Sequence, residues 1–321
     1  MRYRINFVDM NKMLLILLLL NVSCRAQSSF EVVPLGVKGG ADESNLSAYA
    51  IAGSGTKNYV CLDAGTLHSG IQKAIDQKIW TGDATGFLRK NIKGYLISHP
   101  HLDHVSGLIL NAPDDSAKFI YGIPGCLTVL QEKYFSWKSW ANFGNEGEKP
   151  TLNKYQYVTL VPGEEIPLAN TPMFVTPYLL SHVVPNESTA FLIRNNDQYI
   201  LYLGDTGSDK IEKTTRLQEL WSAVAPLIQT KKLNAIFIEV SFDNQQPENL
   251  LFGHLTPKLL MQELEVLSSF SGQQALKNFP IVITHMKPAG NREEVIKEQL
   301  KKSNSLNVKL IFPEQGSLLK F

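Results

Sequence analysis

The chain has 321 residues, of which 44% are hydrophobic and 19% are charged, and this balance is typical of a folded globular protein. It excludes disorder, collagen and coiled coil as descriptions of the whole chain, and three cysteines are too few for a disulfide scaffold. The formal net charge of +1 conceals an asymmetry, because residues 1–26 contain four basic residues and one acidic residue. The rest of the chain therefore carries −2. This argues against binding to long nucleic acid, which requires many lysines and arginines to neutralise the phosphates.

The first 26 residues have the order of a secretory signal: a basic region, a short apolar core at Met13–Leu20, and then small or polar residues. The apolar run is too short to span a bilayer, which takes about 20 residues. Two processing routes stay open: cleavage before Gln27, or attachment of a lipid anchor to Cys24 in a loose lipoprotein box. We therefore expect export, with the protein periplasmic or membrane-anchored and facing away from the cytoplasm. The alternative is an N-terminal core helix, but a core helix would be amphipathic.

Residues 27–321 are predicted to form one domain, because no repeat, low-complexity tract or flexible linker divides this part of the chain. Short apolar strands alternate with helical patterns, which favours an α/β protein of two packed sheets with helices outside. The predicted strands are 47–52, 59–62, 94–98, 189–193, 198–203, 235–240, 280–284 and 308–312. The predicted helices are 66–79, 211–228, 258–267 and 293–301. We expect irregular structure after Ala112, including an aromatic cluster at residues 134–143.

Polar residues interrupt this apolar pattern at or just past the ends of predicted strands. Loops from several strands converge at such edges, and active sites of layered α/β proteins gather there. The residues in question are Asp63, His99, Asp205, Glu239 and His285.

The densest group of metal-ligating residues is Ser98–His104, which reads SHPHLDH. Three histidines and one aspartate within six residues are improbable by chance at the usual frequencies of these residues. Neutral imidazole is the commonest protein ligand of Zn²⁺, and a carboxylate adds an oxygen ligand. In a tight turn after a strand, His99 and His101 would point toward one ion, while Asp103 and His104 would reach a second.

The HxHxDH pattern after a strand resembles the metallo-β-lactamase superfamily, which implies a four-layer αββα sandwich with a one- or two-zinc site. The longer stretch from His99 to Pro113 is similar to the signature of the class II cyclic-nucleotide phosphodiesterases, in which an apolar segment and a small residue precede the proline. The superfamily resemblance covers nearly all of residues 30–321, whereas the class II signature covers only residues 99–113.

The resemblance implies three further metal ligands. His182, in the segment LSH, matches the third histidine of the first metal site. Asp205, in YLGDTG, matches the aspartate that bridges the metals, and His285, in ITHMKP, matches the last histidine of the second site. The implied cofactor is two divalent metal ions, with zinc expected and manganese or iron as alternatives. The complete set of predicted ligands is His99, His101, Asp103, His104, His182, Asp205 and His285.

Two acid–base residues are left over, Glu239 at the end of the strand IFIE and His254 in FGHLTP. The phosphodiesterase branch, including the tRNA 3′-processing endonucleases, has a similar pair that is read as a proton-transfer pair. A carboxylate raises the pKa of a neighbouring imidazole and holds it protonated, ready to donate to a leaving alkoxide. The alternatives are a supporting contact of Glu239 with a metal-binding histidine and a helix-capping contact of His254. His68 matches no ligand position and is interpreted as structural.

The leading hypothesis is metal-dependent hydrolysis of a phosphodiester, the 3′,5′-cyclic phosphate of a small nucleotide such as cAMP or cGMP, to the 5′-nucleotide. Two ions would hold the phosphate oxygens and share a hydroxide that attacks phosphorus. The predicted catalytic residues are Asp103, Glu239 and His254. Candidates for the base pocket are Thr206, Ser208, Asn244 and the aromatic residues of 134–143.

Three alternatives are weighed against this hypothesis. Another hydrolase of the same fold, such as a lactamase or lactonase, would not need the pair formed by Glu239 and His254. An RNA-processing phosphodiesterase is disfavoured by the acidic body and the export signal. A non-catalytic metal-binding surface protein would lack a bridging ligand or a proton donor, and neither is missing from the sequence. The oligomeric state is left open.

Overall fold

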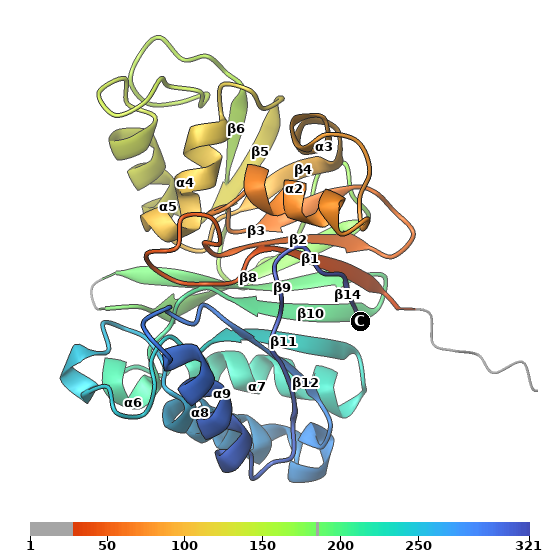
Figure 1. Ribbon diagram of the computed structural model, residues 1–321, viewed down its shortest axis with the longest axis vertical. Helices are drawn as coiled ribbons and strands as arrows, with labels where there is room; N and C mark the ends of the chain where they lie inside the picture. The colour runs from red at the N-terminus through yellow and green to blue at the C-terminus, as the bar shows by residue number, and fades with distance from the viewer. Residues whose placement is uncertain (1–27, 184–185) are drawn as a thin grey trace, which may run out of the picture.

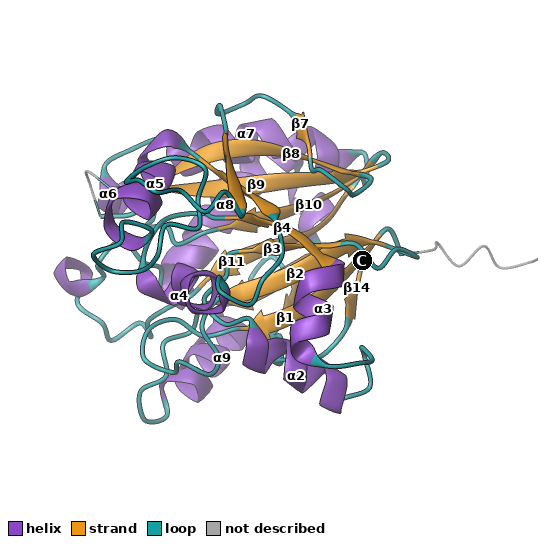
Figure 2. Ribbon diagram, turned by 90° about the horizontal axis from the view of Figure 1, so that it is seen from above, coloured by secondary structure: helices purple, strands orange, loops and turns teal. Residues whose placement is uncertain are grey.

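The computed structural model describes residues 28–183 and 186–321. The predicted signal segment, including Cys24, lies outside these residues. Two seven-stranded sheets pack face to face, with helices on their outer faces (Figures 1 and 2). The αββα sandwich predicted from the sequence is confirmed. In the described part of the chain, no helix combines the length and apolar character needed to cross a membrane.

The first sheet contains the strands of the N-terminal half and the last strand of the chain, in the order β14-β1-β2-β3-β4-β5-β6. Its strands are β1 (Phe30–Gly36), β2 (Ala48–Gly53), β3 (Tyr59–Leu62), β4 (Ile92–Leu96), β5 (Lys118–Gly122), β6 (Tyr155–Thr159) and β14 (Leu319–Lys320). The helices on its side are α2 (His68–Asp76), α3 (Ala84–Asn91), α4 (Leu102–Asn111) and α5 (Pro124–Val129), the last continued by a π-helical turn at Leu130–Tyr134.

The second sheet has the order β13-β12-β11-β10-β9-β8-β7. Its strands are β7 (Ile166–Pro167), β8 (Met173–Ser181), β9 (Glu187–Asn195), β10 (Gln198–Leu203), β11 (Leu233–Glu239), β12 (Pro280–Thr284) and β13 (Lys309–Ile311). The α-helices on its side are α6 (Asp209–Glu212), α7 (Arg216–Gln229), α8 (Pro257–Ser271) and α9 (Arg292–Ser303). Two short 3₁₀ helices are Glu248–Leu250 and Gln273–Leu276.

Apolar side chains fill the space between the two sheets. Alternation along β1 sends Val32 into this layer, while Val33 packs on the helical side of the sheet. Across the layer, Tyr49 of β2 meets Phe237 of β11, with ring centroids 5.6 Å apart. Because both faces of the first sheet are covered, β2 is buried at every position.

The helix predicted at 211–228 is wrong as one unit, because the structure divides it into α6 and α7. Lys213, at the end of α6, adopts a left-handed backbone with φ 55°. The carboxylate of Asp209 accepts the backbone N–H groups of Leu217 and Gln218 at 3.0 and 2.8 Å. These are first-turn amides of α7, which have no partner within a helix, so capping by Asp209 favours a new helix start.

Several strands are absent from the prediction, namely β1, β5, β6, β7, β8 and β14. The region after Ala112 contains β5 and β6, although residues 135–154 form neither helix nor strand. The strand β8 includes Pro177, a residue that normally argues against a central strand. It is accommodated because β8 pairs with β9 along its whole length, whereas β7 pairs only with Phe174 and Val175.

The directions of the strands determine where the site forms. Strands β3 and β4 are parallel, and so are β10, β11 and β12. Their carboxyl ends therefore lie at common edges, and the polar residues of these strand ends converge there. They are Asp63 after β3, His99 after β4, Asp205 after β10, Glu239 at the end of β11 and His285 after β12.

Candidate metal centre

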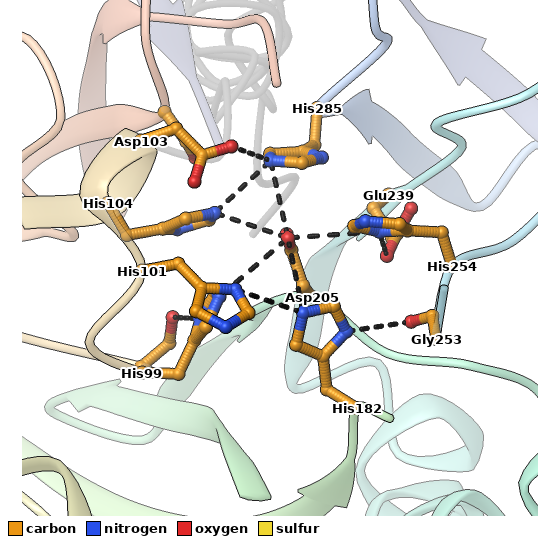
Figure 3. Close-up of polar contacts among 12 residues, drawn as sticks. His99, His101, Asp103, His104, His182, Asp205, Glu239, Gly253, His254 and His285 are labelled. Carbon is orange, nitrogen blue, oxygen red and sulfur yellow. Dashed lines mark hydrogen bonds and ion pairs between the residues drawn. The ribbon is translucent and has the colours of Figure 1, made fainter. Parts of the chain in front are cut away.

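All seven residues predicted as metal ligands lie together, at the edge where the parallel strands of both sheets end (Figure 3). Four of them come from the loop after β4 and the first turn of α4, and the other three follow β8, β10 and β12. Figure 3 shows the carboxylate of Asp205 in the middle of a ring of histidines. The cluster divides into two groups on either side of this carboxylate.

The first group consists of His99, His101 and His182, whose ligand atoms lie within 4.8 Å of one another. Nε2 of His182 lies 3.3 Å from Nδ1 of His101. One oxygen of Asp205 lies 3.8 Å from Nε2 of His99 and 4.0 Å from Nε2 of His182. The group thus offers three ring nitrogens and one carboxylate oxygen, a set that suits tetrahedral zinc and other divalent transition metals.

The second group consists of Asp103, His104 and His285. Nε2 of His285 lies 3.1 Å from Nε2 of His104 and 3.2 Å from an oxygen of Asp103. The same Asp205 oxygen that faces the first group lies 3.3 Å from Nε2 of both His104 and His285. Asp205 therefore lies between the groups, where a carboxylate shared by two ions would lie.

Hydrogen bonds orient the rings of the first group. His182 donates from Nδ1 to the carbonyl oxygen of Gly253 at 2.9 Å. The hydroxyl of Ser98 donates to Asp63 at 2.8 Å and accepts from Nδ1 of His99 at 3.0 Å. In both rings Nδ1 carries the proton, so the lone pair of Nε2 faces the cluster. Such contacts are what hold metal-binding histidines in the correct tautomer.

The second group is oriented in the same way. His104 donates from Nδ1 to the carboxylate of Asp63 at 2.8 Å. His285 donates from Nδ1 to the hydroxyl of Ser241 at 2.9 Å, and this hydroxyl donates in turn to Glu239. Asp63 therefore supports one histidine of each group. It binds His104 of the second group directly and His99 of the first group through the hydroxyl of Ser98.

One ring nitrogen of the cluster lacks the hydrogen-bond partner that a buried polar atom needs. Nε2 of His99 is buried and has no hydrogen-bond partner among them. Leaving a buried polar atom without a partner costs about 1–3 kcal/mol, and coordination of a cation would remove this cost. The five histidine nitrogens and two carboxylates of the cluster are also the donors that divalent transition metals prefer. The residues present therefore fit a divalent-metal centre.

The charge states of His99, His182 and Asp205 agree with this donor set. Burial lowers the pKa of His99 well below its ordinary value, and the neighbouring His104 lowers it further. Burial also lowers the pKa of His182 to about 4. Both rings are therefore neutral near pH 7, which is the form that binds a metal. Burial alone would raise the pKa of Asp205, but His285 and His104 hold it well below the usual range and keep the carboxylate charged.

Glu239 and His254 form a buried pair beside the cluster. His254 donates from Nδ1 to Glu239 at 2.7 Å, and the same nitrogen lies 3.7 Å from Asp205. Glu239 also accepts the backbone N–H groups of Thr206 and Ser241 at 3.0 and 3.2 Å, which hold it in place. Burial opposes the charged form of His254, but the adjacent Glu239 outweighs burial and raises the pKa of the imidazole. The pair thus has the electrostatics of a proton donor.

Sequence reasoning assigned no role to three residues that support the rings: Asp63, Ser98 and Ser241. Of the three, only Asp63 has a feature that is recognisable in the sequence, because it is a charged residue directly after an apolar strand. Its backbone is left-handed, with φ 56°, which costs a non-glycine residue about 1–2 kcal/mol and is typical of functional sites. His68, interpreted as structural, is exposed at the start of α2 and belongs to neither group.

Thr206 and Ser208, suggested for the base pocket, both have buried side chains with structural contacts. The side chain of Thr206 is fully buried, and its backbone N–H is bound to the glutamate of the proton-donor pair. Ser208 is buried and caps α6 by accepting the N–H of Ile211. In the aromatic segment, Tyr134 lies beside the HxHxDH motif and donates its hydroxyl to the carbonyl of Pro100 at 2.9 Å.

Comparisons with known proteins identify the family of this chain. The family model of class II cAMP phosphodiesterases matches residues 30–316. A 3′,5′-cyclic-nucleotide phosphodiesterase of Aliivibrio fischeri is 44% identical over 97% of this chain and 99% of its own length. A probable 3′,5′-cyclic-nucleotide phosphodiesterase of Yersinia pestis is 37% identical over 93% of this chain and 91% of its own.

Solved structures show the same fold at lower identity. Unliganded yeast PDE1 has a TM-score of 0.80 at 22% identity and is matched over 92% of this chain and 100% of its own. The short form of human tRNase Z has a TM-score of 0.54 at 16% identity, over 90% and 98% of the two chains. The enzyme class predicted from the sequence is confirmed, and the fold together with the cluster implies binding of divalent metal. The chain belongs to the class II cAMP phosphodiesterase family.

Proposed function

We propose that this protein hydrolyses the 3′,5′-cyclic phosphate of cAMP or cGMP to the 5′-nucleotide, with two divalent ions that are zinc in the native enzyme. The observation that carries the proposal is the pair of Glu239 and His254 beside the cluster, 3.7 Å from Asp205. The leaving alkoxide of a cyclic nucleotide is a strong base, so its departure needs a proton donor. Lactam or lactone hydrolysis in the same fold would not need this pair.

The proposed ligand roles follow the two groups described above. Support comes from the position of Asp205 between the groups and from the hydrogen bonds that turn each ring toward the cluster. Zinc is favoured because histidine nitrogen dominates the donor set. In this assignment His99, His101 and His182 would hold one ion, Asp103, His104 and His285 would hold the other, and Asp205 would serve both.

In the proposed mechanism, bound divalent ions supply positive charge for the phosphate oxygens and lower the pKa of water toward ~7. The side chains of the protein orient the metal-binding rings and supply the proton. The hydrogen bonds from Asp63, Ser98 and Ser241 hold the imidazoles in one tautomer. Glu239 occupies Nδ1 of His254, so Nε2 is the nitrogen that donates a proton to the leaving 3′-oxygen. Burial of the pair keeps solvent from competing for this proton.

A panel of substrates tests the function on the purified mature chain: cAMP, cGMP, 2′,3′-cyclic AMP, bis(p-nitrophenyl) phosphate and nitrocefin. We expect turnover of a 3′,5′-cyclic nucleotide and none of nitrocefin. Turnover of nitrocefin without any hydrolysis of cyclic nucleotides would overturn the proposal.

Metal content tests the two-ion assignment. Because seven side chains are assigned to two ions, elemental analysis of protein prepared without chelator should give close to two transition-metal ions per chain, mostly zinc. A reproducible content near zero in folded protein would contradict the assignment of the cluster.

We also propose that the protein is exported and acts outside the cytoplasm. The support is the basic and then apolar order of residues 1–26, with an apolar core at Met13–Leu20. Mass spectrometry of the native protein should find a chain that begins at Cys24 and carries lipid, or one that begins near Gln27 without lipid. Recovery of an unprocessed chain from the cytoplasm would refute export.

A further inference from the structure

Two cavities are lined by residues of the cluster and a third adjoins it through Gly253, and the position of the nucleotide base depends on which of the three it enters. One of about 200 Å³ lies beside His99 and His101. A second of about 540 Å³ lies beside Asp103. The third, of about 660 Å³, is called here the Phe252 cavity, and it lies between α6 and the loop that leads to His254. Its walls include Val183, Ile211, Lys213, Leu251, Phe252 and Gly253.

The Phe252 cavity adjoins the first group of the metal centre at His182. Gly253 lines the cavity, and its carbonyl oxygen holds Nδ1 of His182. The approach is so close that a Cβ on Gly253 would lie 2.8 Å from this nitrogen and 2.5 Å from the backbone nitrogen of Val183. The wall of the cavity at Gly253 therefore packs directly on the outer edge of the His182 ring.

The backbone around this cavity is strained at several bulky residues. Val183, Lys213 and Phe252 have φ values of 56°, 55° and 52°, in the left-handed region. This region is rare for large side chains and a clear outlier for a β-branched one. Strain of this kind persists where it serves a binding or catalytic site. Here it accompanies exposed apolar surface, since 59% of Phe252 and 38% of Val183 are accessible to solvent.

We propose that the Phe252 cavity binds the purine base of the cyclic nucleotide, with the ring of Phe252 as its stacking surface. The inference rests on the proposed function and names the base site of that reaction. Ligand pockets have volumes of about 300–1,000 Å³, a range that includes the Phe252 cavity and excludes the cavity beside His101. Stacking on an aromatic ring suits adenine and guanine equally. Lys213, exposed in the wall, presents an ammonium donor to the acceptor nitrogens of either base.

The cavity beside Asp103 is the competing position. It has exposed apolar residues, Leu102 at 61% and Leu110 at 65%, but its lining contains no phenylalanine, tyrosine or tryptophan. The one ring in its lining is the imidazole of His68, which offers a smaller stacking surface than a phenylalanine ring. The two positions therefore predict opposite results for alanine variants of Phe252 and Leu102.

The test compares Phe252→Ala with Phe270→Ala in the metal-loaded enzyme. Phe270 is a matched control, since it is also an exposed phenylalanine and lies near the far end of α8, about 20 Å along the helix from its start. Loss of a base–aromatic stack weakens binding by roughly 5- to 150-fold. We expect Phe252→Ala to raise the KM for cAMP by about tenfold or more, with kcat and metal content little changed, and Phe270→Ala to change none of them.

Inhibition by products separates base binding from phosphate binding. Phe252→Ala should raise the inhibition constant of 5′-AMP by about the same factor as KM and leave that of inorganic phosphate unchanged. Phe252→Trp should restore both values, because it keeps the aromatic surface. Unchanged KM in Phe252→Ala, or a rise in KM in Leu102→Ala instead, would overturn the proposal. If the wild-type enzyme hydrolyses no cyclic nucleotide, the proposed function fails. The base site is then judged by calorimetric binding of 5′-AMP to the same variants.

Discussion

Replacing His254 with alanine is expected to lower cyclic-nucleotide turnover by ~10²–10⁴-fold, the usual effect of losing a general acid. Metal content should stay at the wild-type value, because His254 is paired with Glu239 and is not assigned as a ligand. The loss should be much smaller with bis(p-nitrophenyl) phosphate, whose p-nitrophenolate leaving group is a weak base and needs little protonation. Steady-state kinetics on the two substrates, with elemental analysis of each preparation, measure these effects.

The control for this variant is His68→Ala, which removes an exposed histidine that belongs to neither ligand group and should change neither activity nor metal. The structure also makes the contrary result informative, because His254 lies within reach of a metal together with His182 and Asp205. Loss of metal in His254→Ala, or an equal loss of activity on both substrates, would show that His254 is a ligand or a structural residue. The argument against a lactamase-type hydrolase would then lose its main support.

Replacing Asp205 with alanine is expected to have the larger effect. One oxygen of this carboxylate lies 3.3 Å from Nε2 of both His104 and His285 and 3.8 Å from that of His99. Its removal takes away the negative charge between the two groups and the ligand assigned to both ions. Metal content should fall to one ion per chain or fewer. Activity on both substrates should fall by at least ~10³-fold, since each ion contributes several kcal/mol of transition-state stabilisation.

Asp197→Ala is the matched control for this experiment. Asp197 lies in the turn before β10, at the opposite end of the strand from Asp205, and its side chain is 70% exposed. Its removal should leave both metal content and activity unchanged. If Asp205→Ala retained two ions, the carboxylate would not be a shared ligand, and the two-group interpretation of the cluster would be wrong.

Much of the site could be predicted from the sequence because its ligands occupy short, chemically dense segments. His99, His101, Asp103 and His104 fall within six residues, and their spacing alone indicates a metal site. Asp205 and His285 are each a single residue in a short segment, and they were predicted as ligands through the resemblance to a known family. In the structure these segments follow the carboxyl ends of parallel strands, which brings them together.

Features that depend on contacts between distant segments could not be predicted. The role of Asp63 requires that the end of β3 lie under the ring of His104, a contact across 41 residues. The break between α6 and α7 depends on where the carboxylate of Asp209 points, although residues 211–228 have a continuous helical pattern. The base pocket was sought at Thr206 and Ser208, but polarity does not reveal that these side chains are buried.

From the sequence by itself, hydrophobic periodicity predicts an α/β protein and the HxHxDH spacing predicts a metal site, because both are local properties. The enzyme family and the ligands His182, Asp205 and His285 were implied by the resemblance to a known family. The tertiary structure decided which atoms hold each imidazole, where the pair of Glu239 and His254 lies relative to Asp205, and which cavities lie near the cluster. The physical reason is that hydrogen bonds and cavities depend on distances between side chains that only packing of the two sheets establishes. The exposed ring of Phe252, carried on a left-handed backbone, is such a case, since its sequence neighbourhood is that of an ordinary loop.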